Sequence, residues 1–135
     1  MSFSQNFLIY FATLVIFGGL DLLWVWAISK RLYRTYAEGL LRAKFNAIPA
    51  VVFYLFYTVG LMVFVIVPAF HNTSLGQAMG MGALFGLFTF GTYALVNLTV
   101  IRDWSLLVVL VDIIEGMFIT GIACTVAYYL SQIVT

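Results

Sequence analysis

The sequence predicts an all-α integral membrane protein, a four-helix up-down bundle with the N and C termini both outside. Three observations lead to this prediction: the composition, the grouping of apolar residues into four long runs, and the placement of the basic residues. Of the 135 residues, 64% are hydrophobic and only 8% are charged. A soluble domain carries about 25% charged residues. A chain this short cannot bury so much apolar surface within itself, so lipid must cover much of it.

The apolar residues form four runs, at approximately 7–28, 47–70, 78–101 and 104–130. Each run reaches the roughly 20 residues that a helix needs to cross a hydrocarbon core about 30 Å thick. In lipid such segments must be helical, because no water is present to satisfy an open backbone. The connections are short, so residues 1–135 are expected to form a single transmembrane domain.

The basic residues predict the orientation of the chain in the membrane. Five of the six follow the first run and the sixth follows the third, whereas residues 71–74 and both termini carry none. By the positive-inside rule, both basic loops are expected in the cytoplasm and both termini in the periplasm, for a multi-pass protein of the inner (plasma) membrane. The predicted membrane-surface residues are Lys30, Arg31, Arg34, Arg42, Lys44 and Arg102.

Residues 30–46 are predicted to form an interfacial helix on the cytoplasmic surface. Tyr33, Tyr36, Leu40 and Ala43 recur at helical spacing, and basic residues occupy much of the remaining surface. This amphipathic pattern favours an anchor resting on anionic headgroups. A dedicated surface for docking a lipid or a partner is the alternative.

Three acidic residues, Asp21, Asp112 and Glu115, lie inside the predicted spans. An ionised carboxylate at the centre of a span costs about 2.5–3.5 kcal/mol, so such residues suggest a functional site. Asp21 lies nine residues before Lys30, and Asp112 lies eight residues after Trp104. At 1.5 Å per residue, both acids are expected about 12–14 Å from the cytoplasmic boundary.

Polar groups on the other two predicted spans lie near the same depth, which predicts an internal pocket of carboxyl, phenol and amide groups. Small residues on the third and fourth spans, Gly82, Gly86 and Gly116, are expected to allow close helix packing. The candidate ligand or proton pocket consists of Asp21, Trp24, Tyr54, Tyr57, Tyr93, Asn97, Asp112 and Glu115.

Asp112 and Glu115 lie one helical turn apart. Two carboxyls at this spacing should not both ionise in a medium of low dielectric constant, so at least one is expected to be protonated at neutral pH. Such a pair would suit proton coupling, general acid–base chemistry or cation binding. The alternative is structural: the acids bond to Tyr93, to Asn97 or to each other and only hold the helices in register.

Other kinds of site find little support. His71 is the only histidine and lies in the predicted outer loop, which argues against histidine-ligated haem, zinc or di-iron. No Ser–His or Cys–His pair can form near the acids, so catalytic residues are not identified and no metal or cofactor is expected. The absence of a basic stripe argues against a nucleic-acid partner.

The chain resembles the uncharacterised bacterial membrane family DUF2177 over nearly its whole length. In the first half the resemblance rests on 21–24 (Asp-Leu-Leu-Trp), 30–33 (Lys-Arg-Leu-Tyr), Tyr54, Tyr57, Gly60, Phe64 and Pro68. In the second half it rests on Gly82, Gly86, Tyr93, Asn97, Trp104, Asp112 and Gly116. The resemblance implies the four-helix fold and the polar pocket, but no biochemical activity.

The sequence departs from the family pattern at three positions. Ala94, Val96 and Glu115 stand where the family has Asp, Thr and Trp. A carboxylate is therefore missing from the third span and present on the fourth, so an activity tied to the third-span aspartate does not carry over.

Three functions fit the sequence. The favoured one is a ligand-binding or proton-linked, transport-like bundle, which predicts a homo-oligomer because four helices are few to enclose a pathway. An accessory or assembly subunit of a larger membrane complex is the second. An intramembrane lipid-modifying enzyme, with a protonated carboxyl as acid and Tyr93 or Asn97 to position the substrate, is the third.

Overall fold

A computed structural model describes residues 1–40 and 46–135, and all of its regular secondary structure is helical. The prediction of an all-helical fold is therefore confirmed. The part of the predicted interfacial helix at 41–45 lies outside the described residues, and so do Arg42 and Lys44.

The first helix continues well beyond its apolar run. It comprises α1 (Phe3–Trp24), the π-helical turn η1 (Val25–Ser29) and α2 (Lys30–Ala37), and the short 3-10 turn η2 (Glu38–Leu40) follows. The helix starts in a capping box, in which Ser2 Oγ accepts from the Gln5 N–H at 3.2 Å and Gln5 Oε1 accepts from the Ser2 N–H at 2.8 Å. Residues 30–37 therefore extend the first span and do not begin a separate helix.

The other three helices begin at similar polar caps. The second comprises α3 (Ala47–Leu61), the π-helical turn η3 (Met62–Ile66) and α4 (Val67–His71), and Asn46 caps its start. The third and fourth are α5 (Leu75–Val100) and α6 (Leu106–Val134), which begin after Ser74 and Ser105. All four helices are long and apolar enough to cross a membrane.

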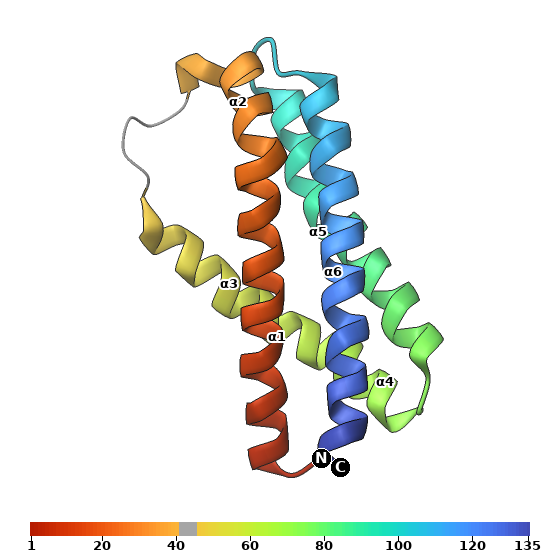
Figure 1. Ribbon diagram of the computed structural model, residues 1–135. Coiled ribbons are helices and arrows are strands. Elements are labelled where there is room, and N and C mark those ends of the chain that lie inside the picture. Colours follow the sequence, from red (N-terminus) through yellow and green to blue (C-terminus); the bar gives the residue numbers. More distant parts are fainter. Residues whose placement is uncertain (41–45) are drawn as a thin grey trace.

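The helices form a bundle with both termini at one end (Figure 1). Both termini lie together at one end, where Gln5 Nε2 donates to the Val134 carbonyl at 3.0 Å. The end of α2 and the loop between α5 and α6 lie at the other end, here called the loop end. Helices α1 and α6 run side by side, and α3 crosses α1 obliquely (Figure 1). The basic residues of the described chain, Lys30, Arg31, Arg34 and Arg102, thus belong to segments at the loop end.

The closest helix contact joins α5 and α6 through glycines. A Cβ added to Gly86 would lie 1.9 Å from the Gly116 carbonyl oxygen, and one added to Gly116 would lie 2.4 Å from the Phe90 side chain. A Cβ on Gly82 would lie 2.9 Å from Cys124 Cβ. The two backbones can approach this closely only because these side chains are absent.

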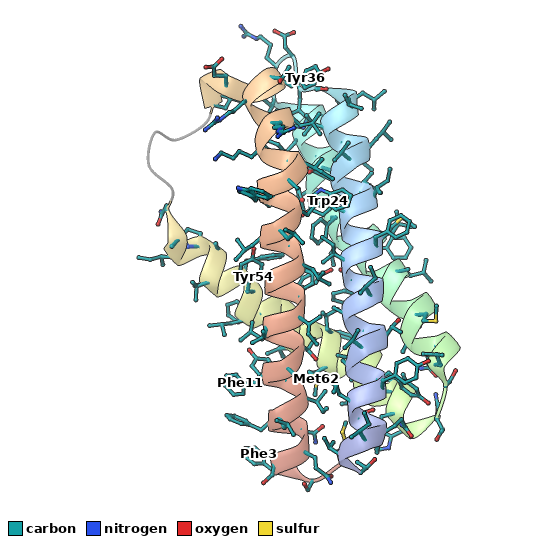
Figure 2. The ribbon with its side chains drawn as sticks, in the orientation of Figure 1. Phe3, Phe11, Trp24, Tyr36, Tyr54 and Met62 are labelled. Atoms are coloured by element: carbon teal, nitrogen blue, oxygen red, sulfur yellow. The ribbon has the colours of Figure 1, made fainter. Side chains whose placement is uncertain are left out.

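Apolar side chains fill the terminal half of the bundle and also cover its outside. The buried cluster includes Ile9, Leu61 and Ile66. On the outer surface, Phe3 and Phe11 project from α1 away from α6 (Figure 2). A surface this apolar is unfavourable in water and is typical of a helix that faces lipid. The molecule is thus built as a membrane protein with four candidate spans.

Candidate functional site

Two carboxyl side chains meet where α1 and α6 pack together. Asp21 on α1 and Glu115 on α6 are only 7% and 4% exposed. The Glu115 side chain lies within hydrogen-bonding reach of Asp21. Two carboxyl groups can share a hydrogen bond only when one of them carries a proton, so a proton held between these two side chains would join α1 to α6.

The helix α3 contributes a phenol to this pair. Tyr54 lies where α3 passes α1 (Figure 2), and its hydroxyl donates to Asp21 Oδ2 at 2.7 Å. The Phe17 ring packs against the edge of the Tyr54 ring, with centroids 6.0 Å apart. The Asp21 carboxyl therefore has a fixed donor on one side and Glu115 on the other.

The third acid has a different phenol as its partner. Asp112 lies one turn from Glu115 on α6, and its Oδ2 accepts a 2.6 Å hydrogen bond from the Tyr33 hydroxyl on α2. Trp104 packs edge-on against the Tyr33 ring at 5.8 Å. Together, Tyr54, Asp21, Glu115, Asp112 and Tyr33 form a series of polar side chains, here called the acid–phenol chain.

A smaller polar group lies further towards the terminal end. The Tyr57 hydroxyl lies 2.8 Å from Thr120 Oγ1 and 3.1 Å from Thr89 Oγ1. Thr89 gives its only hydroxyl proton to the Phe85 carbonyl at 2.7 Å. Tyr57 must therefore donate to Thr89, and it accepts from Thr120.

The turn η1 explains how Tyr33 reaches α6. Twelve residues separate Asp21 from Tyr33, and in a regular α-helix they would turn Tyr33 about 120° away from the face of Asp21. The π-helical turn at Val25–Ser29 rotates less per residue, which returns Tyr33 to the α6 side. Ser29, at the end of this turn, is buried as well.

Three buried polar atoms near the acid–phenol chain have no hydrogen-bond partner among the described residues. They are Trp24 Nε1, Ser29 Oγ and Trp104 Nε1. Leaving such a group unpaired costs about 1–3 kcal/mol, and buried groups of this kind often mark a functional region. All three belong to segments at the loop end or next to Asp21.

Within residues 1–40 and 46–135, the other predicted pocket residues form no hydrogen bond to the three acids. Tyr93 is 40% exposed and its ring packs on Phe90 at 5.6 Å. Among the described residues, no hydrogen bond involves the Asn97 side chain, and the Asn97 carbonyl accepts from the Ile101 N–H. Trp24 packs against the apolar core, and Tyr57 bonds to the two threonines.

The pocket predicted from the sequence did not include Tyr33, Thr89 or Thr120. The helical spacing at 30–46 placed Tyr33 on the membrane-facing side of a predicted interfacial helix, and a π-helical turn leaves no reliable mark in a single sequence.

Two surface hollows lie away from the acid–phenol chain. One of about 440 Å³ lies between α1 and the second helix near the termini, and one of about 300 Å³ lies beside Lys30 and Arg31.

Within residues 1–40 and 46–135, no cluster of three or more His, Cys, Asp or Glu side chains has the geometry to hold a metal ion. The acid–phenol chain consists of carboxyl and phenol groups. Carboxyl groups can bind and release protons, and both kinds of group can exchange hydrogen-bond partners.

Comparison with known proteins supports the membrane assignment. The family model DUF2177, described as a predicted membrane protein, matches residues 6–129. Comparisons with curated proteins and with solved structures found no match.

Proposed function

We propose a proton-linked, transport-like role for this chain, which belongs to the DUF2177 family of predicted membrane proteins. In this role, the proton shared by Asp21 and Glu115 controls the contact between α1 and α6. The observation that carries the proposal is the approach of these two buried carboxyls to within hydrogen-bonding reach.

Loss of the shared proton would place two negative charges side by side. At an effective dielectric constant of about 20, unit charges about 4 Å apart repel by about 4 kcal/mol. Because 1.36 kcal/mol corresponds to a tenfold change, this repulsion could alter a two-state population by roughly a thousandfold. Protonation would hold α1 against α6, and deprotonation would favour their separation.

The two phenols provide hydrogen-bond donors to the aspartates in both the protonated and the deprotonated state. Tyr54 donates to Asp21, and Tyr33 donates to Asp112, so each of these aspartates keeps a donor when it is ionised. The donors come from α2 and α3, whereas the acids come from α1 and α6. A change of protonation state would therefore act on segments from three of the four spans.

We propose that protons reach the buried acids from the loop end. The Tyr33–Asp112 bond joins α2, at that end, to α6, whereas the terminal half is filled by apolar residues such as Ile9, Val65 and Ala127. Grouping of the described basic residues at the loop end supports a cytoplasmic position for it, with both termini periplasmic in an inner membrane. Protons would then enter from the cytoplasm.

A homo-oligomer forms part of the proposal, because four helices are few to surround a pathway for a second solute. Mass measurement after extraction in a mild detergent tests this part separately. A monomer would remove the oligomer from the proposal and leave proton binding unaffected.

Infrared difference spectroscopy of the purified protein in liposomes tests proton binding directly. Between acidic and alkaline buffer, the wild type should show the carbonyl band of a buried, protonated carboxyl. Asp21→Asn and Glu115→Gln should each shift that band or change the pH at which it disappears, because each substitution removes one member of the pair. Asp103→Asn is the matched control, because it removes an exposed carboxyl in the loop between α5 and α6 and should leave the band in place.

Proton-linked function requires in addition that the helices move. A spin label on α1 and another on α6 should show a distance that changes between acidic and alkaline buffer in the wild type. In Glu115→Gln that distance should stay constant. A titrating pair with no change of distance would mean that the acids only hold the helices in register, and the proposed function would be wrong.

A further inference from the structure

We propose that the 300 Å³ hollow beside η1 and α2 binds the phosphate-bearing headgroup of an anionic phospholipid. The hollow is lined by Trp26, Ala27, Lys30, Arg31 and Arg34. These side chains lie outside the acid–phenol chain, so the inference is independent of the proposed function.

The charge of the hollow favours an anion. Lys30, Arg31 and Arg34 bring three positive charges to a single depression. The stretch 22–37, which carries these three cations, contains no acidic residue. Arginine presents several N–H donors in a planar fork that matches phosphate oxygens, and lysine adds a compact charge.

The sequence order on this surface matches the shape of a phospholipid. Leu22, Trp26, Lys30 and Arg34 follow one another at intervals of four, and Leu23, Ala27 and Arg31 form the adjacent row. Both rows run from exposed apolar side chains towards the cations at the loop end. An acyl chain could lie along the leucines while its phosphate reaches the cations.

Trp26 lies between the apolar leucines and the cations of this surface. Its side chain is 71% exposed, although it is one of the largest apolar side chains in the chain. Tryptophan is enriched at the headgroup level of membranes, because its ring is apolar and its N–H is polar. Ala27, which also lines the hollow, has a small side chain. This combination favours a lipid headgroup over a soluble anion.

Native mass spectrometry of the detergent-solubilised protein, with added phosphatidylglycerol or phosphatidylcholine, tests the proposal. The wild type should retain phosphatidylglycerol in preference to phosphatidylcholine. A cation near an anionic lipid contributes about a fivefold effect, so the double variant R31Q/R34Q should weaken retention about 25-fold. Arg102→Gln is the control, because Arg102 is an exposed cation in the loop between α5 and α6 and does not line the hollow; it should change retention much less than the double variant does.

Two further measurements separate the lipid from a small anion and from general attraction. Leu23→Gln should weaken phosphatidylglycerol binding, whereas inorganic phosphate alone should not displace the lipid. Displacement by inorganic phosphate would show a small-anion site and would overturn the proposal. Equal losses per charge in R31Q/R34Q and Arg102→Gln, or equal retention of the two lipids, would also overturn it. Unchanged thermal unfolding would verify that each variant is folded.

Discussion

The Tyr33 hydroxyl donates to Asp112 Oδ2 at 2.6 Å and so links α2 to α6 across 79 residues of sequence. Asp112 is buried, and this phenol is its hydrogen-bond donor among the described side chains. The bond depends on η1, because the π-helical turn rotates Tyr33 towards α6. π-Helical turns are frequent at functional sites, where they redirect a side chain at the expense of regular helical bonding.

Tyr33→Phe should destabilise the folded protein. The substitution removes the donor but leaves the Asp112 carboxyl buried, which should lower the free energy of unfolding by about 1–3 kcal/mol. Thermal unfolding in detergent measures the change. Tyr36→Phe, at a residue that is 47% exposed on the same helix, should have little effect. Equal effects of the two substitutions would show that the bond to Asp112 does not contribute to stability.

A double-mutant cycle should detect the bond between Tyr54 and Asp21. Because the two side chains are in direct contact, the effects of Tyr54→Phe and Asp21→Asn on unfolding should deviate from additivity by about 0.5–3 kcal/mol. The control cycle combines Tyr54→Phe with Asp103→Asn, whose carboxyl lies in a loop. The control cycle should be additive, and additivity in the first cycle would argue against the bond.

Gly86→Ala should disrupt the contact between α5 and α6. The added Cβ would overlap the backbone carbonyl of Gly116, which cannot rotate aside as a side chain could. Overpacking of this kind costs about 1–3 kcal/mol or more, so we expect less folded protein in the membrane and a lower unfolding temperature.

Gly80→Ala is the matched control for Gly86→Ala, because a Cβ at Gly80 meets nothing within 4 Å. Alanine favours helix over glycine by up to about 1 kcal/mol, so this variant should be neutral or slightly more stable. If Gly86→Ala were equally well tolerated, the close approach of the two helices would be refuted.

Cys124 should resist labelling until the bundle opens. Its thiol is buried between α5 and α6, and the chain has no other cysteine. A maleimide should react slowly with the folded protein and fully after denaturation, since access limits the reaction of a buried thiol. An exposed cysteine introduced by Ser4→Cys in a Cys124→Ser background should react at once. Rapid labelling of Cys124 in the folded protein would contradict the packing described.

Much of the architecture could be predicted without a structure, because it depends on composition and length. The four apolar runs predicted four spans, and the described residues contain four helices of sufficient length. The residues at which the helices begin and end were less predictable. α1 starts at Phe3, and the helix continues into α2, because polar residues such as Lys30 and Arg34 can extend a helix beyond the apolar run.

The site was only partly predictable. The burial cost of a carboxylate singled out Asp21, Asp112 and Glu115, and the structure brings all three into one polar chain. Counting residues from the cytoplasmic boundary placed Tyr54 at the depth of Asp21, and the Tyr54 hydroxyl does donate a hydrogen bond to Asp21. The same counting selected Tyr93 and Asn97, for which no hydrogen bond to an acid is found among the described residues; counting gives the height of a residue but not its hydrogen-bond partner.

By itself, the sequence determined that this protein consists of four apolar helices with acids among them. The reason is local: in lipid each segment must satisfy its own backbone, whatever its neighbours do. Tertiary structure alone decided which phenol meets which acid. That outcome depends on how each helix is rotated and where the helices cross. The close glycine contact fixes α5 against α6, and the π-helical turn before Tyr33 rotates its side chain towards α6.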